Sequence, residues 1–140
     1  MDRIYQYLKD AHLFYIATCE GDQPRVRPFG FVMKFHGKLW FSVLDGKQVY
    51  EQMLKNSKVE LCIVGKDHTW LRLAGTAVFD EAEAAEAEKA RGEAAAAEKG
   101  KGPDLTKIYP DGMPRRHLFF LKDCDGRIYS HRSIVAHVCF

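Results

Sequence analysis

The sequence has few cysteines, and none of them follow the paired spacing of metal or redox sites. Cys19, Cys62, Cys124 and Cys139 lie far apart among 140 residues, and no C-x-x-C pair occurs. This spacing indicates neither a zinc site nor a redox dithiol. Isolated thiols are typical of a reducing compartment, so we expect a cytoplasmic protein with free cysteines.

Long apolar runs and an excess of one charge are missing as well. No stretch approaches the roughly 18 apolar residues of a membrane span. The opening MDRIYQYLKD is amphipathic and lacks the apolar run of a signal peptide. The formal net charge of +2 is too small to indicate a nucleic-acid partner. We therefore expect neither a membrane nor a nucleic acid as a partner.

Catalytic patterns are equally scarce. The chain has no constellation of paired carboxylates, and its six histidines are scattered. His36 falls in an expected turn, where a solvated side chain is more common than a catalytic one. His137 and Cys139 stand two residues apart, but a metal site there would need further ligands. The sequence thus assigns no catalytic residue and no metal.

What the sequence does contain is a strong β pattern. Apolar residues make up 46% of the chain, enough for a core, and the length is that of one domain over positions 1–140. Short apolar, alternating segments are expected as strands at about 13–19, 25–35, 38–44, 58–63, 69–79, 117–122 and 127–130. Residues 123–126 would form a hairpin loop, and 134–140 is apolar but of uncertain type. The pattern predicts a mainly β fold with six or seven antiparallel strands in a closed or partly closed barrel.

Helices are expected at the margins of this barrel. Asp2 can cap a short amphipathic first helix. A second helix begins at Lys47 and carries Val49, Met53 and Leu54 on one side. These elements would be peripheral helices of a β protein.

One low-complexity segment, the Ala/Glu-rich residues 81–102, interrupts the strands. Asp80 and Glu83 have the spacing of a capping box, and Ala and Glu are strong helix formers. Because large apolar residues are almost absent, we interpret the segment as a solvated helical insertion, followed by a short helix at 103–109. Six glutamates against three basic residues over 81–99 give a balance of −3, which leaves +5 on the remainder. A modestly basic body favours an anionic small ligand.

Positions 24–50 carry the clearest functional pattern. Arg25 and Arg27 are two apart on an expected strand, so their side chains share a face. Lys47 opens the following helix, whose N–H groups and dipole favour an anion. The three cations can converge on one phosphate-bearing ligand, although solvated surface charges are the more common meaning of such residues.

Two further signals lie inside the same stretch. His36 and Gly37 form a two-residue hairpin signal between strands. Pro28 and Gly30 do not suit a central strand, and they indicate a bulge, a close approach of backbone to a ligand, or an edge strand.

The order of these segments resembles the FMN-binding split barrel of the pyridoxamine 5′-phosphate oxidase-like flavoproteins. The resemblance covers about positions 1–80, through the segments FYIAT, RVRPFGF, LWFSV, GKQVYEQMLKNSKVEL and WLRLAGTAVF. It is closest to the small bacterial branch that includes nitroimidazole-reductase-like proteins. FFLKDCDGRIYS is similar to the closing strands of the family, though less specifically.

The resemblance implies FMN as cofactor and a homodimer with flavin sites at the subunit interface. The residues it assigns to the cofactor are Arg25, Val26, Arg27, Pro28, Phe41, Ser42, Lys47, Gln48 and Trp70. The first four would run along the flavin ring, the next two would line the ribityl chain, and the helix start would hold the phosphate. The strand with Trp70 and Arg72 would face the partner subunit.

The function implied by the resemblance is an FMN-dependent oxidoreductase that takes electrons from a reduced nicotinamide or a reduced partner and acts on a small molecule. The oxidase's pyridoxal-phosphate contacts have no match here, so vitamin B6 oxidation is not expected. A non-catalytic flavin or haem carrier or sensor is the alternative, because no acid or base stands out. An oligonucleotide-binding barrel using Arg25, Arg27, Phe29 and Phe31 is a third interpretation, which the low charge disfavours.

Overall fold

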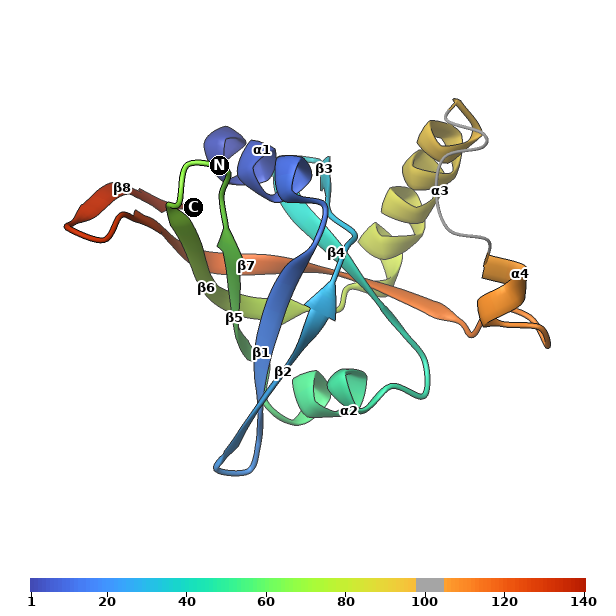
Figure 1. Ribbon diagram of the computed structural model, residues 1–140. Helices are drawn as coiled ribbons and strands as arrows, with labels where there is room; N and C mark the ends of the chain where they lie inside the picture. Colours follow the sequence, from blue (N-terminus) through green and yellow to red (C-terminus); the bar gives the residue numbers. More distant parts are fainter. Residues whose placement is uncertain (98–104) are drawn as a thin grey trace.

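The computed structural model describes residues 1–97 and 105–140, and within them an antiparallel sheet curls around one core (Figure 1). These residues form eight strands and four helices. In chain order the elements are α1 (Asp2–Ala11), β1 (Phe14–Glu20), β2 (Gln23–Phe29), β3 (Met33–Phe35), β4 (Lys38–Leu44), α2 (Gln48–Lys55), β5 (Lys58–Val64), β6 (Trp70–Val78), α3 (Glu81–Ala97), α4 (Leu105–Ile108), β7 (Arg116–Tyr129) and β8 (Ile134–Cys139). The mainly β expectation is confirmed, with eight strands in place of six or seven.

The sheet is organised around β7, which runs across the molecule from α4 to β8 (Figure 1). The strand order is β2-β1-β5-β6-β7-β4-β3, and β8 also pairs with β7. One edge of β7 pairs with β6; the other edge pairs with β4 over its first part and with β8 over its last part. The sheet does not close on itself, which is the arrangement of a split barrel.

The expected hairpin loop at 123–126 is wrong, because β7 continues through it. Ala74 pairs with Asp125 and Thr76 with Lys122, so one residue of β6 faces two residues of β7. This is a β-bulge, and Asp123 adopts a positive φ of 53° within it. The turn-like composition therefore marks a bend in one long strand, and the segment after it forms β8.

The expected single strand over 25–35 is also wrong, since β2 ends at Phe29 and β3 begins at Met33. Within the described residues β2 pairs with β1 alone, so Pro28 lies on an edge strand, where its missing N–H is tolerated. A Cβ at Gly30 would stand 3.3 Å from the backbone oxygen of His12, so the chain passes close to the end of α1. The hairpin at His36 and Gly37 is confirmed, with φ of 46° and 70°.

Two groups of apolar side chains hold the elements together. The main core fills the barrel, and α1 and α2 contribute Ile4, Leu8, Val49 and Met53 to it. Leu54 was expected on the same side of α2, but it is 54% exposed. The second cluster lies on the outer face and consists of Trp40, Ala87, Leu118 and Phe120.

The second cluster corrects the interpretation of the Ala/Glu-rich segment as a solvated insertion. Ala87 of α3 is completely buried against the sheet. Small alanine side chains let the helix backbone approach the rings of Trp40 and Phe120, which a search for large apolar residues overlooks. Asp80 caps the helix by accepting from the Glu83 N–H at 3.0 Å. The Glu83 carboxylate, however, binds Lys38 at 2.7 Å rather than completing the capping box.

Two smaller expectations concern the helices, and the first of them is wrong. Asp2 was expected to cap α1, but the N-cap is Met1 and Asp2 forms an ion pair with Lys34 instead. The short helix expected at 103–109 is α4, and the end of the insertion at 98–102 lies outside the described residues. None of the helices in the described ranges is long and apolar enough to cross a membrane.

Candidate functional site

A groove opens at the seam of the split barrel, where the two ends of the sheet face each other. Its volume is about 640 Å³. Residues 27–31, from β2 and the segment after it, form one wall. Residues 42–44 of β4 and residues 46–49 at the start of α2 form the other. The groove thus combines two strand edges and one helix start.

The β4 wall presents backbone hydrogen-bond donors. The N–H of Asp45 donates to the Arg115 oxygen on the β7 side, at 2.8 Å. Backbone groups of successive strand residues point to alternate edges, so the N–H groups of Ser42 and Leu44 point away from β7 and toward the groove. Because β3 pairs with β4 only as far as Trp40, these two donors are available to a ligand.

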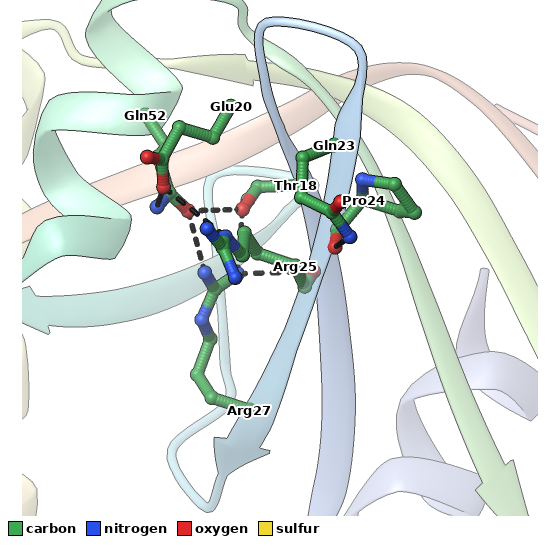
Figure 2. Close-up of polar contacts among 7 residues, drawn as sticks. All are labelled: Thr18, Glu20, Gln23, Pro24, Arg25, Arg27 and Gln52. Atoms are coloured by element: carbon green, nitrogen blue, oxygen red, sulfur yellow. Dashed lines mark hydrogen bonds and ion pairs between the residues drawn. The ribbon is translucent and has the colours of Figure 1, made fainter.

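Arg27 is held at the base of the other wall by neutral oxygen atoms (Figure 2). Its Nη1 donates to Thr18 Oγ1 at 2.6 Å, and its Nη2 donates to Gln52 Oε1 at 2.5 Å. The Thr18 hydroxyl also donates to Gln52 Oε1, at 2.6 Å. Thr18 and Gln52 are 2% and 6% exposed, so the guanidinium is oriented by a buried, rigid pair.

The positive charge of Arg27 is not neutralised by a direct acid partner in the described chain. The nearby carboxylate of Glu20 accepts instead from Gln52 Nε2 at 2.9 Å and from Arg25 Nε at 3.2 Å. Burial lowers the pKa of Arg27, and the neighbouring charge of Arg25 lowers this pKa further. An arginine still stays protonated at neutral pH, so Arg27 brings an uncompensated cation to the groove.

Lys47 supplies a second cation across the groove from Arg27. It is the N-cap residue of α2, with extended backbone angles and no side-chain capping bond. Its ammonium group has no partner among the described residues, and the residues on either side of it also line the groove. The first N–H groups of a helix lack intrahelical acceptors, so this corner attracts an anion.

The structure brings together five of the nine residues assigned to the cofactor from sequence, namely Arg27, Pro28, Ser42, Lys47 and Gln48. The other four assigned residues do not line the groove. Phe41 is buried in the main core, and Arg25 pairs with Glu20. Val26 is 69% exposed on the opposite face of β2, while Trp70 stacks on Tyr129 at the far end of β6.

Thr18 and Gln52 were missed by the sequence analysis, although both carry a signal. Thr18 follows Phe14 and Ile16 at the inward positions of β1, and Gln52 precedes the buried Met53. A polar residue at such a position requires a buried partner. Arg27, two positions from Arg25 on a strand, is the partner that both residues share.

A smaller cavity of about 220 Å³ lies beside the groove, between α3 and the start of β7. His117 and Tyr50 line it, and their rings stack with centroids 4.2 Å apart. His117 Nε2 lies 3.2 Å from Asp45 Oδ1. Arg116 of this cavity donates to Ser42 of the groove at 3.4 Å, so one hydrogen bond links the two sites. Burial lowers the pKa of Arg116, and the charge of Arg91 lowers it further.

An open antiparallel barrel with a cationic groove at its seam is the architecture of the split-barrel proteins. The chain matches the family model of pyridoxamine 5′-phosphate oxidase over residues 1–120, and it belongs to this family. The resemblance noted from the sequence is therefore confirmed. Among curated proteins, none matches the chain.

Solved structures agree with this assignment. A NimC/NimA family protein of Clostridium acetobutylicum is 32% identical, with a TM-score of 0.78, and the match covers 100% of this chain and 93% of that one. A pyridoxamine 5′-phosphate oxidase-related FMN-binding protein of Nostoc punctiforme is 14% identical, with a TM-score of 0.59 over 99% and 92% of the two chains. A FAD-binding protein of Mesorhizobium loti is 16% identical, with a TM-score of 0.53 over 89% and 91%. The last two show the shared fold alone.

Proposed function

We propose that this protein is a flavoprotein that binds FMN in the seam groove. The observation that carries the proposal is the pair of cations Arg27 and Lys47 at one groove, neither of them neutralised by a carboxylate within the described residues. A phosphate would lie at the start of α2, within reach of the Lys47 ammonium and the free helix N–H groups.

The other properties of the groove suit the rest of the cofactor. Its volume falls within the roughly 300–1,000 Å³ of ordinary small-molecule sites. Phe29 and Phe31 offer apolar surface to a planar ring, and the N–H groups of Ser42 and Leu44 offer donors to a polyol chain. The relatives described as binding FMN and FAD support a flavin, and both cofactors contain the phosphate that this groove favours.

We further propose that two copies associate through the outer face of β1, β5 and β6. Tyr15 and Val64 on this face, and Val26 beside it on β2, are 50%, 67% and 69% exposed, an apolar surface that a monomer rarely leaves uncovered. Trp70 and Arg72 lie on the same face, because they pair with Val64 and Cys62 of β5. A second copy there would cover these side chains and complete each flavin site at the interface.

The function we propose is that of an oxidoreductase. A bound flavin would supply the electron transfer itself. The chain would hold the phosphate through Lys47, orient the cofactor by the Arg27 guanidinium and the β4 donors, and exclude water with Phe29 and Phe31. A reduced nicotinamide or a reduced partner would supply the electrons, and a small molecule would accept them.

A second candidate function is a flavin or haem carrier or sensor without turnover. Of the described residues that line the groove, only Arg27 and Lys47 carry an ionisable side chain, so the lining holds no histidine or carboxylate for acid–base work. This candidate predicts a coloured protein that reduced nicotinamides do not bleach, whereas the oxidoreductase predicts rapid bleaching.

A visible absorption spectrum of the purified protein, recorded before and after addition of a reduced nicotinamide, tests both candidates. We expect two flavin bands, at close to one FMN per chain after reconstitution and washing. Identification of the released cofactor distinguishes FMN from FAD. A single intense Soret band would indicate haem, and no retained chromophore after reconstitution would contradict the flavoprotein proposal.

A further inference from the structure

Four polar side chains form a square on the outer face of β7 and β8, remote from the seam groove. Asp125 pairs with Cys139 and Arg127 pairs with His137 in the antiparallel register. Residues two apart on a strand share a face, and directly paired residues point the same way. Ala136 and Val138 of β8, and Phe140 just after it, pack instead against the core. The backbone pairing itself therefore places these four side chains together.

Three of the four side chains carry metal-ligating atoms that already stand close together. His137 Nε2 lies 2.9 Å from Asp125 Oδ1 and 3.3 Å from Cys139 Sγ. All three atoms lie within 4.8 Å of one another. Zinc binds sulfur at roughly 2.3 Å and nitrogen or oxygen at roughly 2.0–2.2 Å, so the ligand atoms of a tetrahedral site stand roughly 3.4–3.6 Å apart. The two separations from His137 would grow by a few tenths of an ångström, and the Asp125–Cys139 separation would shorten by at most about 1.2 Å.

We propose that Asp125, His137 and Cys139 bind one divalent cation of the Zn²⁺ class, with water in the fourth position. A thiolate and an imidazole select a borderline or soft metal over Mg²⁺ and Ca²⁺, which prefer oxygen ligands. The three residues are partly or fully exposed, so the cation can enter from solvent. The sequence left His137 and Cys139 without a third ligand, and the β7–β8 hairpin supplies Asp125.

Arg127 orients the carboxylate of this site. Its Nη2 donates to Asp125 Oδ2 at 2.7 Å, and its Nε donates to Oδ1 at 2.9 Å. In the metal-bound form, Oδ2 would keep its hydrogen bond from the Arg127 guanidinium. Oδ1 would bind the metal through its second lone pair, in place of its present contact with His137. Such hydrogen-bonded support is common around metal ligands. The charge of Arg127 opposes that of the metal, so we expect moderate rather than very tight affinity.

The cation would tie the last strand to the sheet. In the described chain β8 pairs with β7 alone, and its end is held by two backbone hydrogen bonds between Cys124 and Phe140, at 2.7 and 3.1 Å. A metal bound across Asp125 and Cys139 would add a side-chain link at the same end. Metal binding should therefore reduce opening of β8 specifically.

Titration of the chelator-treated, reduced protein with Co²⁺ and with Zn²⁺ tests the proposal. Tetrahedral Co²⁺ has visible bands at the red end of the spectrum, beyond flavin absorption. We expect these bands to saturate at one Co²⁺ per chain, to be displaced by Zn²⁺, and to be lost in Cys139→Ser and His137→Ala. Cys62→Ser is the matched control, because Cys62 is also exposed but lies on β5, and it should keep the bands.

Bands that are absent at one equivalent, or that persist in Cys139→Ser, would overturn the proposal. Both substituted side chains are exposed, so we expect an unchanged thermal midpoint in the presence of chelator, which verifies that each variant is folded. Hydrogen exchange of residues 134–139 provides a second readout, because Zn²⁺ should slow it in the unmodified protein and not in Cys139→Ser. Flavin content, measured on the same samples, reports separately on the seam groove.

Discussion

Arg27 on β2 donates to the amide oxygen of Gln52 on α2 at 2.5 Å, across 25 positions of sequence. The N-cap of the same helix is Lys47, the second cation of the groove. One partly buried hydrogen bond thus sets the position of the strand cation relative to the helix that carries the other. The spacing of the two cations is therefore a property of the network around Gln52 rather than of either side chain alone.

Replacement of Gln52 by Met should loosen this arrangement. The change preserves length but leaves Thr18 and Arg27 without their shared acceptor, which should cost about 1–3 kcal/mol of unfolding free energy. FMN affinity should fall in parallel, because Arg27 is no longer oriented. Urea denaturation and FMN titration measure the two effects. Gln6→Met, which removes an exposed amide from α1, is the control and should stay within about 0.5 kcal/mol.

Lys47→Ala should weaken FMN binding without unfolding the protein. A charge-assisted phosphate contact contributes roughly 1.5–3 kcal/mol, which corresponds to about tenfold or more in affinity. Flavin-fluorescence titration gives the dissociation constant. Lys55→Ala, at the opposite end of α2, keeps the same helix and should bind FMN normally. Equal affinities for the two variants would remove Lys47 from the phosphate site.

Ala87→Lys should detach α3 from the sheet. The longer, charged side chain cannot fit between Trp40 and Phe120, and overpacking costs about 1–3 kcal/mol. Release of the helix should expose Trp40, shift tryptophan emission to the red and speed hydrogen exchange along α3. Ala94→Lys, at an exposed position of the same helix, should do neither. Identical spectra for the two variants would mean that α3 does not depend on this contact.

The Cys124 thiol should make the protein less stable at alkaline pH. Burial raises its pKa to about 12, far above the ordinary cysteine pKa of about 8.5. Between these values the unfolded chain loses this proton and the folded chain keeps it. The unfolding free energy therefore falls as pH rises from about 9, by at most about 1.4 kcal/mol per pH unit.

Chemical denaturation at pH 7 to 10.5 measures this slope, and Cys124→Ala should reduce it, because the variant lacks the group. A slope that is the same in both proteins would assign the alkaline loss to other residues. Thiol labelling gives an independent readout. A maleimide should modify the exposed Cys139 in the folded, chelator-treated protein and Cys124 only after unfolding.

Val64→Lys should disrupt the proposed dimer. Val64 is 67% exposed on the face that we assign to the second copy, and a charge there would be desolvated on association. Light scattering after size exclusion should show a shift from dimer to monomer, with a loss of bound FMN. Leu54→Lys, which alters an exposed apolar residue on α2 rather than on this face, should leave both unchanged. A monomeric unmodified protein would contradict the dimer directly.

Local periodicity was sufficient to predict most of the elements. The alternation of Val59, Leu61 and Ile63 defines β5, and the turn at His36 and Gly37 joins β3 to β4 as expected. Lys47 was also predicted at the start of a helix, because the residues after it have helical spacing. Each of these features depends on neighbours within a few positions, which the sequence displays directly.

Non-local packing decided the features that were missed. The turn-like residues at 123–126 lie within β7 because β6 pairs with them on both sides of the bulge. Ala87 is buried because two aromatic rings, from β4 and β7, lie beneath it. Neither partner is close in sequence, so no local pattern could have indicated either outcome.

The sequence by itself determined a β-rich barrel, a helix that begins at Lys47 and the family to which the chain belongs. Only the tertiary structure decided that Arg27 reaches Gln52 and that Asp125 stands beside His137 and Cys139. The physical reason is the range of the interactions. Strand and helix periodicity follows from backbone geometry over a few residues, whereas the site and the ligand cluster depend on pairings that close long loops.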